Sequence, residues 1–280
     1  MTNPDHFRLA GVMGWPAGHS RSPMIHNHWL AEHGLAGVYV PLAIPPDGLP
    51  AALRALPALG FAGCNLTIPH KEAALACMDS VDPLARRIGA VNCVIVRADG
   101  ALAGCNTDGW GFIRSLVDAR PSWRAETGPA VVIGAGGAAR AILASLAEHG
   151  AREIRLVNRT LARAQNLAAE LGAPLRAIDW KDRAAALEGA ALLINTTSQG
   201  MAGEPPLEIS LAALPREALV VDIVYIPRET PLLREARTRG NATLNGLGML
   251  LHQARPAFEA WFGVLPIVTA ELRARVEATL

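Results

Sequence analysis

A glycine-rich turn between a short apolar strand and a helix constrains the fold of this chain more than any other feature. Residues 130–133 read Ala-Val-Val-Ile, the form GxGxx(G/A) follows over 134–139, and the helix is expected from about 137 to 149. The first glycine permits a tight turn, the second lets the backbone approach a pyrophosphate, and the helix N-terminus faces its charge. The turn predicts a dinucleotide site that includes Gly134, Ala135, Gly136, Gly137 and Ala138.

Strand-length apolar runs alternate with helical segments through most of the chain, which is typical of an α/β fold with parallel strands. After residue 130, strands at 152–158, 191–195 and 218–225 and a second helix at 160–171 complete the pattern of a doubly wound, Rossmann-type domain. Before residue 108 a hairpin interrupts the alternation, because Asp99-Gly100 is a strong turn signal. The N-terminal region is therefore expected to hold a mixed sheet.

The chain has 280 residues, enough for two hydrophobic cores. A helix beginning at Asp108 and a polar stretch separate the first region from the glycine-rich strand, and after Asn245-Gly246 only helices are expected. Those helices are predicted to return to the first domain. We therefore expect a substrate-binding and catalytic domain over 1–107 plus 246–280, and a dinucleotide-binding domain over 108–245.

The end of the second strand favours NADP over NAD as the cofactor. Dinucleotide folds usually place an acid there to bind the ribose, whereas this strand ends in Asn158, Arg159 and Thr160, with Arg163 following. A carboxylate would repel the 2′-phosphate of NADP, while Asn158 can hydrogen-bond and the two arginines can pair with the phosphate. The alternative is that the arginines lie on a solvated helix start.

Composition narrows the classes of partner. Lys plus Arg number 26 against 25 Asp plus Glu, so no basic field is available to bind nucleic acid. No apolar stretch reaches the roughly 18 residues of a membrane span, and the first residues do not resemble a signal peptide. We expect a cytoplasmic protein without nucleic-acid or membrane partners, either a monomer or a homodimer. The four cysteines have neither zinc nor CxxC spacing, so no metal is expected.

Two segments of the first domain carry polar residues at helix starts. Ser22 is predicted as an N-cap with Pro23 at the first helical position, and Ser20 and Ser22 could cradle a small carboxylate, although capping alone would explain Ser22. Lys71 follows a strand at the sheet edge where α/β proteins bind ligands. Asp108 is predicted as the N-cap of its helix, and a Lys brought next to an Asp would suit proton transfer.

The chain resembles the shikimate dehydrogenase family, NADP-linked enzymes of aromatic amino-acid biosynthesis. The resemblance covers essentially the whole chain and rests on eight motifs in the order of that family. They are GHSRSPMIHN at 18–27, NLTIPHK at 65–71, GAVN at 89–92, NTDG at 106–109, GAGGAAR at 134–140, NRTxxR at 158–163, INTTSQG at 194–200 and NGLGMLLHQ at 245–253.

The resemblance implies NADP-dependent interconversion of shikimate and 3-dehydroshikimate, with Lys71 and Asp108 as the catalytic pair. It makes Ser20 and Ser22 a clamp for the substrate carboxylate and places Tyr225 near that carboxylate. Contacts to the substrate hydroxyls are implied for Thr67, Asn92 and Gln253, and contacts to the cofactor for Ile223 and Gly246. Cys93, Cys105 and Asn245 stand where relatives often carry other residues, and none of them removes a proposed catalytic group.

Other functions remain open at this point. A quinate/shikimate dehydrogenase of broader specificity would carry the same motifs. A catalytically silent NADP-binding regulator on the same fold would not need both Lys71 and Asp108. A folate-type methylene dehydrogenase shares the two-domain plan but has no need of the serines at 20 and 22.

Overall fold

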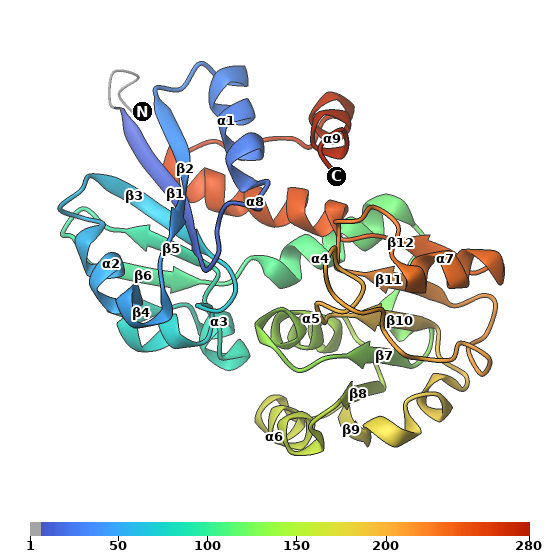
Figure 1. Cartoon of the computed structure of the whole chain (residues 1–280). Coiled ribbons are helices and arrows are strands. Elements are labelled where there is room, and N and C mark those ends of the chain that lie inside the picture. Colours follow the sequence, from blue (N-terminus) through green and yellow to red (C-terminus); the bar gives the residue numbers. More distant parts are fainter. Residues whose placement is uncertain (1–6) are drawn as a thin grey trace. The chain divides into compact units, whose positions relative to one another are not determined.

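A computed structural model describes residues 7–280, which form two compact units (Figure 1). The first unit comprises the chain through Asp108 together with Leu250–Thr279, and the second comprises Gly109–Met249 with Leu280. The boundaries predicted from the sequence lie between residues 107 and 108 and between residues 245 and 246. In the structure the chain returns to the first unit four residues later than predicted. The first unit is thus discontinuous in sequence, and the second is inserted into it.

The first unit contains a mixed six-stranded sheet in the order β2-β1-β3-β5-β6-β4. β1 pairs in parallel with both β2 and β3, while β5 pairs antiparallel with β3 and with β6. The expected hairpin is the β5–β6 pair, which Gly100 closes with a φ of +83°. The strands are β1 Arg8–Gly14, β2 Gly37–Ala43, β3 Phe61–Leu66, β4 Ser80–Val81, β5 Cys93–Val96 and β6 Leu102–Cys105.

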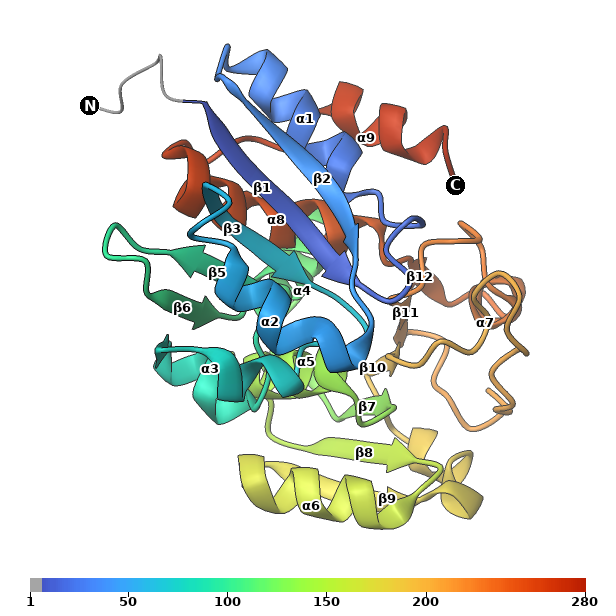
Figure 2. The ribbon, with the colours of Figure 1, turned by 60° about the vertical axis from the view of Figure 1, so that its left-hand side comes forward.

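Helices cover both faces of this sheet (Figure 2). On one face α2 buries Leu53 against Leu66 and Val94. On the other face α1 and α8 contribute an aromatic cluster in which Trp29 and Trp261 are both 1% exposed or less. The helices of this unit are α1 Ser22–Glu32, α2 Leu49–Ala55, α3 Pro83–Ile88, α9 Ala270–Glu277 and most of α8 Leu247–Phe262, with 3-10 turns at Pro46–Gly48 and Ala73–Cys77.

The second unit contains a six-stranded sheet in the order β12-β11-β10-β7-β8-β9, with all neighbouring strands parallel. This is the strand order of the dinucleotide-binding fold, in which the order reverses at the strand that precedes the glycine-rich turn. The predicted Rossmann-type domain is therefore confirmed. Its strands are β7 Ala130–Ile133, β8 Ile154–Asn158, β9 Leu175–Asp179, β10 Leu192–Asn195, β11 Leu219–Asp222 and β12 Ala242–Leu244.

Close helix packing supports the parallel sheet of the second unit. A Cβ atom on Gly109 would lie 1.9 Å from Ser145 Oγ, so a glycine is needed where α4 meets α5. On the sheet, α7 buries Leu233 in the core shared with Val131 and Val220. The helices are α4 Asp108–Ala119, α5 Gly137–Glu148, α6 Leu161–Leu171 and α7 Pro231–Thr238, with 3-10 turns at Ala125–Thr127, Trp180–Asp182 and Ala185–Leu187.

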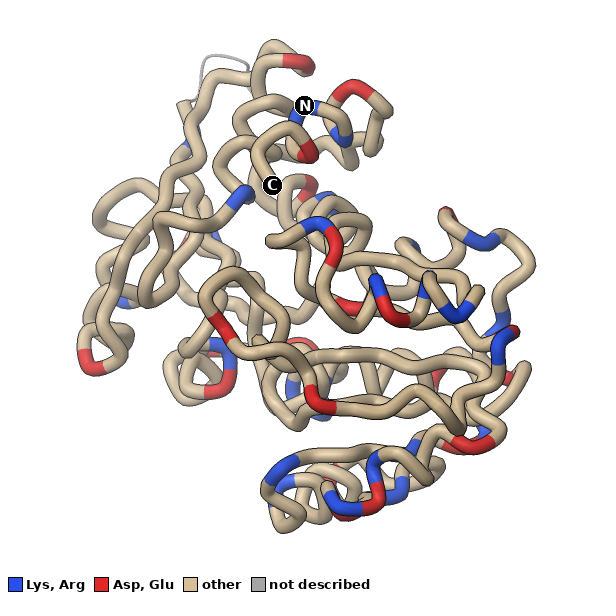
Figure 3. Tube along the Cα trace, turned by 45° about the vertical axis from the view of Figure 1, so that its right-hand side comes forward, with Lys and Arg blue, Asp and Glu red and all other residues tan. Residues whose placement is uncertain are grey.

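Charges of both signs are distributed over each unit, with Lys and Arg interspersed among Asp and Glu (Figure 3). Within residues 7–280, no helix is both long and apolar enough to cross a membrane. The four cysteines are free thiols, with Cys64 and Cys93 buried.

Candidate active site

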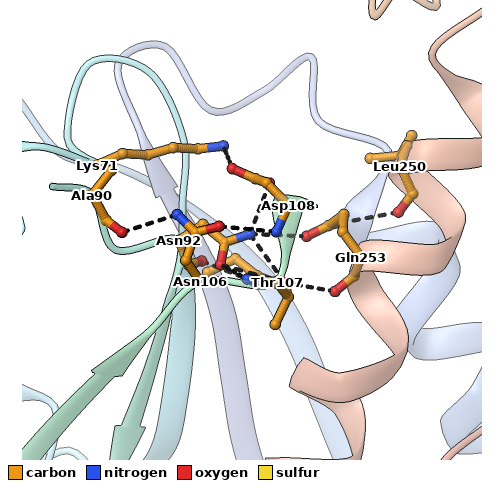
Figure 4. A network of polar contacts seen from close by, with 9 residues as sticks. Lys71, Ala90, Asn92, Asn106, Thr107, Asp108, Leu250 and Gln253 are labelled. Atoms are coloured by element: carbon orange, nitrogen blue, oxygen red, sulfur yellow. Dashed lines mark hydrogen bonds and ion pairs between the residues drawn. The ribbon is translucent and has the colours of Figure 1, made fainter. Parts of the chain in front are cut away.

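A lysine and an aspartate face each other in the first unit (Figure 4). Lys71 Nζ lies 2.5 Å from Asp108 Oδ2, and the two side chains are 17% and 5% exposed. Lys71 lies in the turn that follows β3, and Asp108 is the first residue of α4, shortly after the hairpin strand β6 ends. The fold thus brings together two charges that are 37 positions apart in sequence.

Asn92 holds the aspartate of this pair from the buried side. Its Nδ2 donates to Asp108 Oδ1 at 2.8 Å and to Thr107 Oγ1 at 3.0 Å, and it lies 3.4 Å from Gln253 Oε1. Its Oδ1 accepts from the Thr107 amide at 2.8 Å. Because Asn92 is only 1% exposed, these contacts fix the orientation of its amide and, through it, of the Asp108 carboxylate.

Two further residues, Asn106 and Thr107, complete the network (Figure 4). Asn106 Oδ1 accepts from the Asp108 amide at 3.0 Å, and its Nδ2 donates to Ala90 O at 2.9 Å. Thr107 Oγ1 donates to Gln253 O at 2.8 Å and so links the network to α8. In the sequence both residues stand out only within the motif NTDG at 106–109, and no buried contact is predicted for them, since such contacts leave no periodic signal.

The predicted capping positions of Ser22 and Asp108 are wrong by one residue. α1 begins at Ser22 itself, and its N-cap residue is Arg21. The reason is that Ser20 Oγ accepts from the Ser22 amide at 3.2 Å, so the hydroxyl of Ser20 satisfies the first helical N–H. In the same way α4 begins at Asp108, whose amide donates to Asn106, and the Asp108 carboxylate is directed to Lys71 and Asn92.

A buried tyrosine supports the sheet edge beside these residues. Tyr39 Oη donates to Asn65 Oδ1 at 2.7 Å, and Asn65 Nδ2 donates to Asn92 O at 3.1 Å. Burial raises the pKa of Tyr39 well above its ordinary value, so the phenol stays protonated and acts as a donor. Thr67, just after β3, has its amide bonded to Met13 O at 3.0 Å.

The glycine-rich turn of the second unit has the geometry that a pyrophosphate requires. Gly134 has a φ of +111°, and a Cβ atom there would lie 2.6 Å from Thr196 Oγ1. Gly136 is the N-cap of α5, and a Cβ atom on it would meet nothing within 4 Å. The space in front of the α5 N-terminus is therefore open at the glycine where a phosphate would approach, which fits a dinucleotide.

The predicted 2′-phosphate residues lie at the end of β8. Asn158 is the last residue of β8 and donates from Nδ2 to Thr160 O at 2.9 Å, while Thr160 is the N-cap of α6. Arg163 donates to Ala135 O at 3.4 Å, so its side chain reaches the glycine-rich turn. Arg159 and Arg163 are both exposed, and the structure leaves both guanidinium groups accessible to a phosphate.

Three predicted residues follow β11 and β12 in the second unit. The Ile223 amide donates to Asn195 O at 3.0 Å, and the Gly246 amide donates to Val224 O at 3.1 Å. A Cβ atom on Gly246 would lie 1.9 Å from Ile223 O, so these two residues are in direct backbone contact. Tyr225 is two residues beyond Ile223 and half-buried. Ser20, Ser22, Thr67, Lys71, Asn92, Asp108 and Gln253 all belong to the first unit.

The chain combines such a nucleotide-binding sheet with a separate mixed-sheet unit that holds a close lysine–aspartate pair. This plan defines the class of two-domain α/β dehydrogenases. Three family models match it in sequence order. Residues 12–94 match the shikimate dehydrogenase substrate binding domain, 120–232 match shikimate / quinate 5-dehydrogenase, and 246–267 match the shikimate 5′-dehydrogenase C-terminal domain.

Relatives and solved structures agree over nearly the whole length. The chain is 57% identical over 269 residues to shikimate dehydrogenase (NADP(+)) of Paramagnetospirillum magneticum, covering 96% of this chain and 98% of the relative. It is similar to the structure of shikimate 5-dehydrogenase from Thermus thermophilus in complex with NADP(H) and shikimate, with a TM-score of 0.87, 39% identity and coverage of 98% and 100%. For quinate dehydrogenase from Corynebacterium glutamicum in complex with NAD, the TM-score is 0.89, with 32% identity and coverage of 98% and 100%. The chain belongs to the shikimate dehydrogenase family.

Proposed function

We propose that this protein is an NADP-dependent dehydrogenase that interconverts shikimate and 3-dehydroshikimate, a step of aromatic amino-acid biosynthesis through chorismate. The observation that carries the proposal is the Lys71–Asp108 pair, 2.5 Å apart and held by the buried amide of Asn92. A pair with this geometry can deliver or take up the proton that must move when a hydroxyl becomes a ketone.

The residues of the first unit perform the proton transfer. In the reductive direction the Lys71 ammonium donates a proton to the ketone oxygen as this oxygen becomes the C3 hydroxyl, and in the oxidative direction the amine takes the proton back. Asp108 orients the Lys71 ammonium through its Oδ2, while Asn92 orients the carboxylate through Oδ1. The bound cofactor would supply the hydride as NADPH in the reductive direction and would accept it as NADP+ in the oxidative direction.

The other residues of the first unit would position the substrate. Ser20 and Ser22 lie together at the start of α1, where their hydroxyls and the helix-start amides suit a carboxylate. Thr67, Asn92 and Gln253 would contact the ring hydroxyls. The 3.4 Å contact between Asn92 Nδ2 and Gln253 Oε1 is long enough for a substrate hydroxyl to replace it. From the second unit, Tyr225 would lie near the carboxylate.

NADP would be held by the second unit. Gly134, Ala135, Gly136, Gly137 and Ala138 would receive the pyrophosphate at the α5 N-terminus. The 2′-phosphate would pair with Arg159 and Arg163, with Asn158 and Thr160 beside them. Ile223 and Gly246 would face the other half of the cofactor. The absence of an acidic residue at the end of β8 supports NADP over NAD.

An absorbance assay at the NADPH band tests the proposal. Purified protein is offered shikimate or quinate with NADP or NAD in all four combinations. Turnover of shikimate with NADP at the highest kcat/KM is the expected result. Turnover with neither substrate, combined with measurable NADPH binding, would instead identify a silent NADP-binding regulator.

A broader quinate/shikimate dehydrogenase is the second candidate. The similarity to a quinate dehydrogenase structure at a TM-score of 0.89 favours it. In the four-way assay it predicts quinate turnover within about tenfold of shikimate turnover, which corresponds to a difference of at most about 1.4 kcal/mol in transition-state binding. We also propose a cytoplasmic location, where NADPH is available as the reductant, which cell fractionation can test. Size-exclusion chromatography with light scattering distinguishes a monomer from a homodimer.

A further inference from the structure

A buried polar cluster at the carboxyl ends of β10 and β11 has no part in the chemistry described so far. It consists of Asn195, Asp222 and Thr230, each 0% exposed, all within the second unit. Asp222 Oδ1 accepts from Asn195 Nδ2 at 3.1 Å and from the Val224 amide at 3.0 Å. Asp222 Oδ2 accepts from Thr230 Oγ1 at 2.7 Å. Both carboxylate oxygens therefore have donors.

Asn195 extends the cluster into the segment after β10. Its Oδ1 accepts from the Thr197 amide at 3.0 Å and from Thr197 Oγ1 at 2.7 Å, while its Nδ2 also donates to Gln199 O at 3.0 Å. Its backbone carbonyl accepts from the Ile223 amide at 3.0 Å. A single buried residue thus fixes the loop after β10 and the first residue after β11.

The cluster retains a charged group at a site where burial is costly. Burial raises the pKa of Asp222, which shows that the surroundings disfavour its charged form. The three hydrogen bonds offset this cost, because each favours an acceptor at Asp222. An apolar side chain in place of Asp222 would avoid the cost of burying a carboxylate. It could not, however, accept hydrogen bonds from the two loops.

The two loops lie where the second nucleotide of the cofactor is expected. In a doubly wound sheet, ligands bind beyond the carboxyl ends of the strands, and each half of the sheet receives one nucleotide. The glycine-rich turn and the exposed arginines belong to the half formed by β7, β8 and β9, which leaves β10, β11 and β12 for the nicotinamide half. Gly246, after β12, lies so close to Ile223 that a Cβ atom on it would be 1.9 Å from the Ile223 carbonyl oxygen, while the Ile223 amide donates to Asn195 O of the cluster. Ile223 therefore lies between the Asp222 cluster and Gly246.

We propose that Asp222 and Asn195 are positioning residues that hold the loops after β10 and β11 in the conformation that binds the nicotinamide half of NADP. This inference rests on the proposed function, because it requires NADP as the cofactor. Binding of the adenosine part of the cofactor then depends on the glycine-rich turn and the arginines. Binding of the nicotinamide part depends on the buried cluster.

The test compares two ligands on the full-length protein. NADPH carries both halves of the cofactor, whereas 2′,5′-ADP carries the adenosine and the 2′-phosphate without the nicotinamide. In Asp222→Asn the amide N–H group must face either the Asn195 and Val224 donors or the Thr230 hydroxyl, which already accepts from the Leu233 amide. In Thr230→Val the donor to Oδ2 is lost. Loss of one such hydrogen bond is expected to raise the Kd of NADPH by about tenfold in each variant and the Kd of 2′,5′-ADP by less than about twofold.

Two controls separate positioning from general destabilisation. Asn241→Ala removes a buried amide that donates to Pro215 O, Arg216 O and Ala218 O at the amino end of β11. This variant should lower the melting temperature and leave the Kd of both ligands unchanged. Thr230→Ser keeps the hydroxyl that bonds Asp222 and caps α7, and it should restore NADPH binding.

Two results would contradict the proposal for Asp222 and Asn195. Equal weakening of NADPH and 2′,5′-ADP in Asp222→Asn, or an unchanged Kd of NADPH in both variants, would overturn the positioning role. A failure of the proposed function would instead be seen in the wild-type protein, which would bind neither ligand or would prefer NADH to NADPH. If Asp222→Asn does not fold, the comparison of Thr230→Val with Thr230→Ser decides the question.

Discussion

Asn92 illustrates how one side chain can set the geometry of a buried polar network. An amide group has two N–H donors, and the Nδ2 of Asn92 lies within hydrogen-bond distance of three acceptors. The contacts to Asp108 and Thr107 are the shorter ones, so these two hold the amide in place. The longer contact, to Gln253, is the weakest of the three. Removing this amide would release the Asp108 carboxylate from its buried side.

Replacing Lys71 by alanine should remove the proton donor without removing the substrate site. We expect kcat to fall by about a hundredfold to ten-thousandfold, the range for a positioned general acid, with a small change in the KM for shikimate. Steady-state kinetics at neutral pH measure both constants. A variant that keeps more than about half of the wild-type kcat would exclude Lys71 from proton transfer.

Ser20→Ala should raise the KM for shikimate by about tenfold to a hundredfold, since a hydrogen bond to a charged carboxylate contributes about 1.5–3 kcal/mol. The structure adds a second effect, because Ser20 Oγ also accepts from the Ser22 amide at the start of α1. Loss of this contact is expected to lower stability by about 0.5–2 kcal/mol. Melting temperatures recorded beside the kinetics separate the two effects, and an unchanged KM would place the carboxylate elsewhere.

Arg159→Ala should weaken NADP selectively. The 2′-phosphate is the only chemical difference between NADP and NAD, so the loss is expected to be about 1.5–3 kcal/mol with NADP and close to zero with NAD. Arg163→Ala should have a smaller effect that shrinks as salt is raised, because that exposed side chain lies in the first turn of α6 and already donates to Ala135 O. Values of kcat/KM for both cofactors at two ionic strengths measure this. Equal losses with NADP and NAD would mean that Arg159 supports the loop.

At the scale of elements, α1 attaches to the sheet of the first unit through a buried histidine. The His26 ring stacks on Tyr39 with centroids 4.1 Å apart and an angle of 3° between the planes, and it is 0% exposed. Burial lowers the pKa of His26 from 6.5 to about 3. The folded protein therefore keeps this ring neutral over a range where the unfolded chain protonates it.

His26 should make the stability of the fold sensitive to mild acid. Below pH 6.5 the unfolded state binds a proton that the folded state rejects, so the free energy of unfolding falls as pH is lowered toward 3. Between pH 7.5 and 5 the expected loss is roughly 2 kcal/mol. Urea denaturation of the wild type and of His26→Phe at several pH values measures it, because phenylalanine can stack on Tyr39 without titrating. Parallel pH profiles for the two proteins would contradict the assignment to His26.

Much of the element order could be predicted from the sequence, because apolar strands and capped helices leave local signals. The strands β7, β8, β10 and β11 and both closing helices were predicted, and the glycine-rich turn identified the sheet that contains them. β12 was missed because it has only three residues, and β9 because Arg176 interrupts its apolar pattern. The Lys71–Asp108 pairing was expected, whereas the buried partners Asn106 and Asp222 depend on tertiary contacts that no spacing in the sequence encodes.

At the scale of the whole molecule, the binding of NADP should stabilise the native protein by mass action. At a free concentration about a hundred times its Kd, a ligand that binds only the folded state adds about 2.7 kcal/mol to the free energy of unfolding. Thermal denaturation should therefore show a higher melting temperature with NADP and a smaller increase with NAD at the same concentration. Equal increases with the two cofactors would contradict the preference for NADP.

The discontinuous first unit imposes an order on assembly while the chain is being synthesised. Its sheet is complete in sequence once β6 has emerged, yet α1 covers one of its faces without α8 until α8 arrives, where Trp261 Nε1 donates to Val94 O at 2.9 Å and Phe258 joins the aromatic cluster. All of Gly109–Met249 must be synthesised before the rest of α8 follows, and these residues contain every strand of the second sheet. The inserted nucleotide-binding unit can therefore finish folding first, while the earlier-made sheet waits with the part of its apolar face that α8 covers still exposed to chaperones.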